Sequence, residues 1–397
     1  MRHRPCQKAH LALGVFVTGV WMAVWGAGYA ASQTSAAPVK AQDVIAHHAT
    51  MVYASYEDTY KRALALQEAL RVLVAKPSPA ALEAAKNAWK RARMPYGQTE
   101  VYRFSAGPID NDGLEGQINA WPLDESYIDY VADQPQAGII NRPDTPITKD
   151  GLRALNEEGG ETNISTGYHA IEFLLWGQDL SSDGPGARPY SDYLPQANGT
   201  VAKQQRRGHY LLTVMELLVE DLHKLVQAWA PHRPDNYRAT FVQGNPQEAL
   251  RKMLTGMGTL SRGELAGERM AVALATRDQE DEHSCFSDNT HMDIILNAIG
   301  MQNVYLGRYV RTDGTVLEGP GIKDLISADL HAKMAHQLAT TLVKVHSVEP
   351  PFDHEIVTAD GRQRIQEAIE ALRTQAELIV AIARELGITN LQVELPQ

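Results

Sequence analysis

Long segments of helical periodicity constrain the fold of this chain more than any other feature. Within them, apolar residues recur at the spacing of one helix face. Nowhere does the sequence sustain the alternation of apolar and polar residues that is typical of a β-strand. The longest of these segments are residues 43–73, 201–229 and 358–386. The sequence therefore predicts an all-α fold, most simply two helical bundles.

Proline and polar residues mark where other helices begin and end. Ser78 and Pro79 are typical of an N-cap followed by proline at the first helical position, and Pro95 predicts the end of this second helix. A later helix is expected over 288–309. Residues 96–163 are rich in Gly, Pro, Asp and Asn, and such a long irregular stretch inside a domain is usually functional, so we expect it to enclose a ligand.

The length of the chain predicts more than one domain. A chain of 397 residues exceeds what one ordinary hydrophobic core supports, so we predict two domains of similar size. The expected organisation is a signal peptide, a tether, an N-terminal bundle that contains the irregular region, and a C-terminal bundle. These are residues 1–30, 31–42, 43–198 and 199–397.

The first thirty residues have the pattern of an export signal. Arg2, Arg4 and Lys8 precede the uncharged apolar run 11–25, and small residues near Ala30 mark an expected cleavage site. The apolar run is short for a membrane span. We therefore expect an exported protein that meets a membrane only through this segment.

Composition excludes several classes of function. Lys and Arg number 37 against 48 Asp and Glu, a formal net charge of −11, which argues against nucleic acid as a partner. Two cysteines are too few for a disulfide framework, a four-cysteine zinc site or an iron–sulfur cluster. Cys6 lies in the predicted signal, so Cys285 would be alone in the mature chain, and we expect it to be buried and inert.

His169 and Glu172 are the sharpest chemical signal. They lie three residues apart in the apolar segment 166–177, so on a helix their side chains share one face. A buried carboxylate is costly unless it is paired or bound to a metal, and di-metal bundles combine Glu and His at this spacing, although in the opposite order. The alternatives are a buried His–Glu hydrogen bond and a salt bridge from Glu172 to an arginine such as Arg93.

A second cluster of donor side chains lies in residues 280–293. Asp288 is a good helix N-cap, but capping leaves His283, Cys285 and His291 unexplained.

A third cluster contains Trp89, Arg93, Tyr96, Glu100 and Arg103. Glu100 can form a plain ion pair with Arg93. Alternatively, Glu100 can bind a metal while Arg93 supports it without touching the metal. Glu100 and Asp288 are therefore the carboxylates that could complete a site at His169 and Glu172.

Residues 167–172 carry the pattern Gly-x-His-x-x-Glu, by which the chain resembles the imelysin family. Similar stretches elsewhere are residues 107–110, 114–124 and 282–293, and the resemblance covers about residues 43–390. It implies two domains, each a modified four-helix bundle, with the motif helix near a pocket between them. It also implies an exported protein of iron uptake or iron regulation, periplasmic or associated with the outer membrane, in which His169 and Glu172 bind metal.

A weak internal repeat accompanies these motifs. The apolar run that starts at His291 loosely resembles the one that starts at His169. The two bundles could thus be a pseudo-symmetric duplication, with chance similarity as the alternative.

The favoured hypothesis is a metal-binding protein in which His169, Glu172, Glu100 and Asp288 hold a cation. Iron is the expected metal and zinc is compatible, because imidazole with carboxylate suits both. The expected partners are this metal ion or a small ligand and an iron-uptake protein. The residues expected to line the pocket or support the ligands are Arg93, Tyr96, Gly167, Cys285 and His291.

Two alternatives stay open. One is a metallopeptidase in which Glu172 is a ligand or a base, and the other is a metal-free binding module in which His169 and Glu172 order the pocket. The sequence has no His-Glu-x-x-His helix, Gly-x-Ser-x-Gly elbow or phosphate-binding glycine loop, so these standard catalytic motifs do not support an enzyme. Because the metallopeptidase hypothesis stays open, enzyme activity is left undecided.

Overall fold

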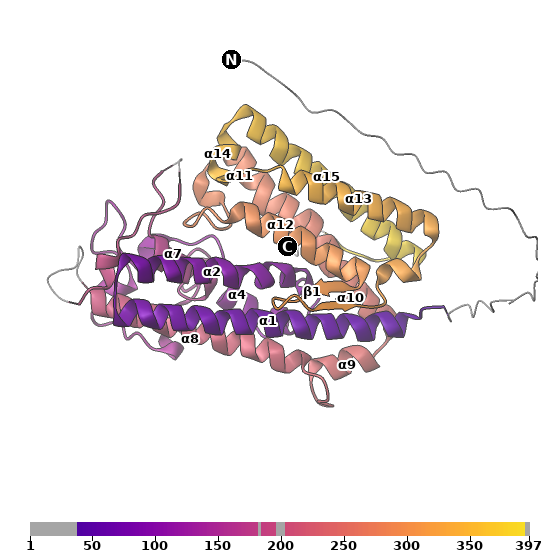
Figure 1. Cartoon of the computed structure of the whole chain (residues 1–397), viewed down its shortest axis with the longest axis horizontal. Helices are drawn as coiled ribbons and strands as arrows, with labels where there is room; N and C mark the ends of the chain where they lie inside the picture. Colours follow the sequence, from indigo (N-terminus) through magenta and orange to yellow (C-terminus); the bar gives the residue numbers. More distant parts are fainter. Residues whose placement is uncertain (1–37, 182–183, 196–202, 394–397) are drawn as a thin grey trace, which may run out of the picture. The chain divides into compact units, whose positions relative to one another are not determined.

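The computed structural model describes residues 38–181, 184–195 and 203–393 (Figure 1). The predicted signal peptide and most of the predicted tether lie outside these ranges. Val39–Gln397 form one compact unit. The described residues contain two short strands, β1 (Arg308–Val310) and β2 (Val316–Glu318), which pair antiparallel, and are otherwise helices and loops. The all-α prediction is confirmed, and no helix in the described ranges is long and apolar enough to cross a membrane.

The motif helix belongs to a group of four helices. α1 (Ala41–Ala75) packs against α2 (Pro79–Thr99) and α8 (Gln204–Trp229), and Figure 1 shows it running between them. α7 (Gly167–Trp176) packs against α2 and α8. The side chain of Ser78 accepts a hydrogen bond from the backbone N–H of Ala81, so the predicted cap of α2 is confirmed.

The region between α2 and α7 is irregular, as predicted, and contains only short helices. These are η1 (Glu100–Tyr102), α3 (Pro108–Asn111), α4 (Leu114–Ile118), α5 (Glu125–Ile128), η2 (Ile139–Asn141) and α6 (Lys149–Leu155). A further short helix, η3 (Tyr190–Tyr193), follows α7.

The later elements are α9 (Tyr237–Gln243), α10 (Pro246–Thr259), η4 (Leu260–Ala271), α11 (Val272–Thr276), η5 (Gln279–Asp281), α12 (Thr290–Leu306), η6 (Ile322–Leu325), α13 (Ala328–His346), α14 (Phe352–Val357) and α15 (Ala359–Glu385). Of these, α10, α13, α14 and η4 pack against α15. η4 is a π-helix, a rare form that often occurs at functional sites.

The predicted end of the second helix at Pro95 is wrong. α2 continues through Pro95 to Thr99, and η1 follows directly. Proline removes one helical hydrogen bond, but packing against α12 holds this turn. Asn297 Nδ2 donates to the carbonyl oxygen of Gly97 over 2.9 Å, and a Cβ on Gly97 would lie 2.9 Å from the Cβ of Leu296.

The later helix is also shorter than predicted. α12 begins at Thr290 and ends at Leu306, and the chain then enters β1 because Gly307 adopts a left-handed conformation with φ of 66°.

One large hydrophobic core cluster joins the early and late helices. It includes Trp89 of α2, Leu218 of α8, Leu254 of α10 and Leu372 of α15. α8, which follows residue 198, packs on α1 and α7, which precede it. The division into two bundles at this residue and the duplication therefore stay predictions.

Candidate functional site

α7 carries two polar side chains in the protein interior, and a glycine fixes each of its ends. Gly167 begins it with φ of 83°, and a Cβ there would lie 2.5 Å from the carbonyl oxygen of Ile118, so only glycine fits. Gly177 ends the helix with φ of 74°, as predicted. All ten residues of α7 are buried. His169 and Glu172 thus lie one helical turn apart in the interior.

His169 and Glu172 bind each other. Nδ1 of His169 lies 2.8 Å from Oε2 of Glu172, and their exposed fractions are 1% and 0%. Burial raises the pKa of Glu172 to about 8 and lowers that of His169 to about 3. The pair therefore carries no net charge at neutral pH. Nε2 of His169 is buried and has no hydrogen-bond partner among the described residues.

The other oxygen of Glu172 binds residue 287. Oε1 accepts hydrogen bonds from the backbone N–H of Ser287 over 3.0 Å and from its hydroxyl over 2.7 Å. This contact connects α7 with the segment that precedes α12.

His283 lies directly against this pair. The rings of His169 and His283 meet edge to face with centroids 4.8 Å apart. Nδ1 of His283 lies 3.1 Å from Oδ2 of Asp293, whose other oxygen pairs with Arg93 over 3.0 Å. Burial, with the charge of Arg269 second, lowers the pKa of His283 well below its ordinary value, so the ring is neutral. A proton on Nδ1 facing Asp293 leaves a lone pair on Nε2.

An acidic cavity of about 370 Å³ reaches His283. His283 Nε2 lies 3.5 Å from the amide nitrogen of Asn119, which also lines the cavity, as does Trp121. Five glutamates and two arginines line it: Glu115, Glu157, Glu161, Glu264, Glu268, Arg103 and Arg269. They come from α4, from the loops that follow η1 and α6, and from η4, so both halves of the chain contribute. Carboxylates outnumber guanidinium groups, which favours a cationic occupant.

The π-helix η4 explains how two of these residues meet. Glu264 and Arg269 are five residues apart, and a π-helix brings residues at that spacing onto one face. Arg269 Nη2 lies 2.8 Å from Oε1 of Glu264, and the same guanidinium donates to Glu100 and to Asn297.

Glu100, predicted as a metal ligand, is held by arginines. Its carboxylate pairs with Arg269 and, over 3.4 Å, with Arg103. Burial by itself would raise the pKa of Glu100, but Arg269 and its other neighbours outweigh it and lower the value to about 2. Glu100 is therefore an ionised anchor for the cavity wall.

Of the other predicted residues, Arg93, Tyr96 and Cys285 are buried, whereas Asp288 and His291 are half-buried. Arg93 is buried beneath His283, with its guanidinium 5.3 Å from the ring centre of Tyr96, and Cys285 is buried as a free thiol. Asp288 is half-buried with φ of 52°, and burial, then Asp179 and Asp353, raise its pKa to about 7. His291 is half-buried and its pKa is lowered by burial.

As arranged, the four predicted ligands do not form a metal-binding set. Glu172 and Glu100 already accept hydrogen bonds from serine and from arginines, respectively. In the described ranges, no three His, Cys, Asp or Glu side chains are grouped so that they could hold one metal ion. Their role as metal ligands stays a prediction.

Sequence reasoning did not single out Asp293 and the cavity glutamates, and it left His283 without a role. His283 and Asp293 are ten residues apart, so no helical or strand spacing signals their contact. The density of donors in residues 280–293 was the available signal.

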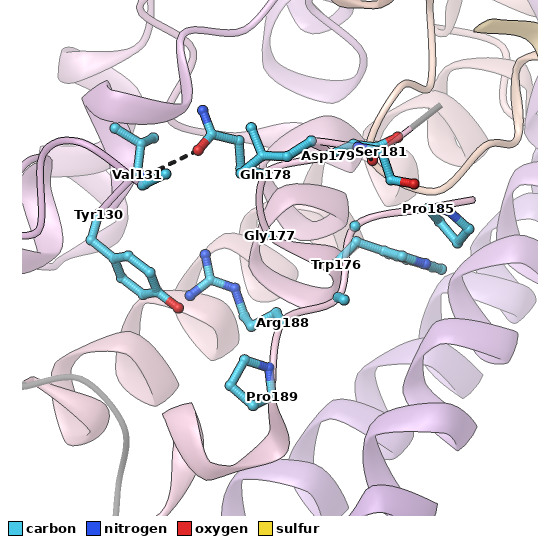
Figure 2. Close-up of a pocket in the computed structure, with 14 residues that line it drawn as sticks. Tyr130, Val131, Trp176, Gly177, Gln178, Asp179, Ser181, Pro185, Arg188 and Pro189 are labelled. Atoms are coloured by element: carbon cyan, nitrogen blue, oxygen red, sulfur yellow. Dashed lines mark hydrogen bonds between the residues drawn. The ribbon is translucent and has the colours of Figure 1, made fainter. Parts of the chain in front are cut away.

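A second cavity, of about 340 Å³, lies beyond the C-terminal end of α7 (Figure 2). Trp176, Gly177 and Arg188 line it, and the side chain of Gln178 accepts a hydrogen bond from the backbone N–H of Ala132 over 3.0 Å. The guanidinium of Arg188 pairs with Asp129 over 2.8 Å. None of the predicted site residues lines this cavity.

The chain is similar to known proteins over most of its length. The model of the peptidase M75 family, described as imelysin, matches residues 52–379. Iron-regulated protein A of Synechococcus elongatus is 25% identical over 342 residues, which cover 83% of this chain and 82% of that protein.

Two solved structures share the fold. A protein from Parabacteroides distasonis that is described as an iron-regulated protein A precursor has a TM-score of 0.64 at 20% identity, covering 88% of this chain and 97% of that one. An imelysin-like protein from Psychrobacter arcticum has a TM-score of 0.61 at 12% identity, covering 90% and 98%.

Proposed function

From the premise that this chain belongs to the imelysin family, we propose that it is an exported iron-handling protein that binds a cationic iron species in the acidic cavity at His283. The name of the relative from Synechococcus elongatus supports the connection with iron. The signal pattern of residues 1–30 supports export, and we place the protein in the periplasm or at the outer membrane.

One observation carries this proposal: a buried histidine that is paired with an aspartate lies at an acidic cavity. Asp293 holds Nδ1 of His283 at 3.1 Å, and metal-binding histidines commonly direct their second nitrogen at a carboxylate in this way. The lone pair of Nε2 then faces the Asn119 amide nitrogen at 3.5 Å in the cavity wall, and a cation that binds Nε2 would replace this contact. Glu268 adds carboxylate oxygens, which hard cations prefer, and so does Oε2 of Glu264, whose Oε1 pairs with Arg269 over 2.8 Å.

The size of the cavity favours an iron ion that keeps other ligands. A volume of about 370 Å³ corresponds to roughly a dozen water molecules at about 30 Å³ each. With few protein donors converging on one point, waters or a small chelator would complete the coordination shell. We therefore propose hydrated or chelated iron as the bound species; zinc could bind the same donors.

Binding measurements test this function. Calorimetric titration with Fe²⁺ under anaerobic conditions, and with Fe³⁺ citrate, should give saturable binding to at least one of them. His283→Ala should weaken that binding about tenfold or more. His336→Ala, which changes an exposed histidine on α13, is the matched control and should leave it unchanged. Equal binding by the His283→Ala protein would contradict the proposal.

A peptidase activity has a separate test. Cleavage of casein by the purified chain that is abolished both by a chelator and by Glu172→Ala would support a metallopeptidase instead. Cleavage that persists in the variant would point to a contaminating protease.

A further inference from the structure

We propose that the Gly-x-His-x-x-Glu helix positions His283 instead of binding a metal itself: Glu172 holds residues 283–287 in place, and His169 supports the His283 ring. The inference rests on the proposed function for the identity of its ligand. The positioning contacts can be tested without any ligand.

The carboxylate of Glu172 is largely occupied by hydrogen bonds. Oε1 accepts from the Ser287 N–H at 3.0 Å and from the Ser287 hydroxyl at 2.7 Å, while Oε2 lies 2.8 Å from His169 Nδ1. In the protonated form of Glu172, the O–H at Oε2 donates to His169 Nδ1 and Oε1 accepts both bonds from Ser287, so both oxygens are engaged. Because the exposed fraction of Glu172 is 0%, this residue can affect the cavity only through the residues that it contacts.

The segment between His283 and α12 has no regular secondary structure and depends on such contacts. The backbone N–H of Ser284 donates to Oγ1 of Thr290 over 3.0 Å, and that of Asn289 donates to the carbonyl oxygen of Ser284 over 3.2 Å. The hydroxyl of Ser284 donates to Asp293. Two anchors come from outside this local group: Glu172 at Ser287, and the backbone N–H of Gly186, which donates to the carbonyl oxygen of Phe286 over 3.0 Å.

His169 supports the His283 ring through a direct ring contact. Its ring meets the His283 ring edge to face at an interplanar angle of 68°, and Trp121 contacts His283 at a centroid distance of 5.8 Å. His283 is thereby enclosed by two rings while Asp293 fixes its Nδ1. Both motif residues then act on the orientation of His283, and neither needs to touch the ligand.

Substitutions of Glu172 separate positioning from direct ligation. In Glu172→Gln, the amide oxygen can still accept both hydrogen bonds from Ser287 and the amide group can donate to His169. Positioning therefore predicts Fe²⁺ affinity within about threefold of wild type for Glu172→Gln, and a loss of about 10- to 100-fold for Glu172→Ala. Ser287→Ala should fall near the lower end of that range, and Ser347→Ala, which alters a serine at the end of α13, should change nothing. If Glu172→Gln loses as much affinity as Glu172→Ala, Glu172 is a direct ligand and the proposal is overturned.

Amide hydrogen exchange gives a readout that needs no iron. In the wild-type protein and in Glu172→Gln, the Ser287 amide should be protected, whereas in folded Glu172→Ala it should exchange at least about tenfold faster. Failure of the wild-type protein to bind iron would refute the proposed function and leave this test intact. Unchanged exchange over residues 283–287 in Glu172→Ala would overturn the positioning role.

Discussion

Replacing Arg269 by methionine should destabilise the folded protein severely. Arg269 is 1% exposed, and its guanidinium donates to Glu100, Glu264 and Asn297 at the wall of the acidic cavity. Methionine keeps much of the length of the side chain but removes every one of these hydrogen bonds. Glu100, which is also 1% exposed, would keep only its longer contacts with Arg103 and Asn297, both of 3.4 Å.

Two routes give the size of this effect. Breaking a buried ion pair by removing one partner costs about 3–5 kcal/mol, because an uncompensated charge stays buried. Independently, the fall in the pKa of Glu100 from 4.5 to about 2 corresponds to about 3 kcal/mol of stability. A lowered carboxyl pKa contributes stability above about pH 4.5 and loses it as the pH falls through about 2. The loss in Arg269→Met should therefore be largest near neutral pH and smaller near pH 3.

Urea denaturation followed by circular dichroism measures this difference. At pH 7 we expect the free energy of unfolding to fall by about 3–5 kcal/mol in Arg269→Met. Arg373→Met, which alters an exposed arginine on α15, should change it by less than about 0.5 kcal/mol. Adding Glu100→Gln to Arg269→Met should recover part of the loss. A loss below about 1 kcal/mol, or no recovery in the double variant, would refute this reasoning.

Three further predictions concern α7 and its surroundings. Gly167→Ala should cost about 2–4 kcal/mol or prevent folding, because its Cβ would lie 2.5 Å from the Ile118 carbonyl oxygen at φ of 83°; a melting curve like that of wild type would contradict this. The Cys285 thiol should resist iodoacetamide in the folded protein and react after unfolding, because burial raises its pKa well above the usual range; rapid labelling of folded protein would disagree. The raised pKa of Glu172, about 8, gives stability that is complete below about pH 4.5 and is lost as the pH rises through 8. Relative to wild type, Glu172→Gln should therefore gain up to about 4 kcal/mol between pH 5 and pH 8, and a difference independent of pH would contradict the shift.

The sequence predicts best what depends on local contacts. The cap at Ser78, the glycine that ends α7 at Gly177 and the burial of His169 and Glu172 all follow from neighbouring residues, and each is confirmed. The family motif also predicts the fold class. Pro95 shows where local reasoning fails, because contacts of α2 with α12, two hundred residues later, outweigh the missing hydrogen bond.

The composition of the site depends on contacts that no spacing encodes. Glu100 was predicted from its carboxylate alone, and its true partner Arg269 lies 169 residues away on a π-helix. The contact of Glu172 with Ser287 spans 115 residues. The sequence could supply the candidate side chains, whereas only the fold decides which of them are paired with each other and which face a cavity.

Anomalous diffraction at the iron edge, on crystals soaked anaerobically with Fe²⁺, tests the central claim most directly. We expect a peak in the acidic cavity, about 2.1 Å from Nε2 of His283, with His169 and Glu172 keeping their contacts behind it. A peak coordinated by His169 and Glu172 themselves, or no peak in the cavity, would contradict the account.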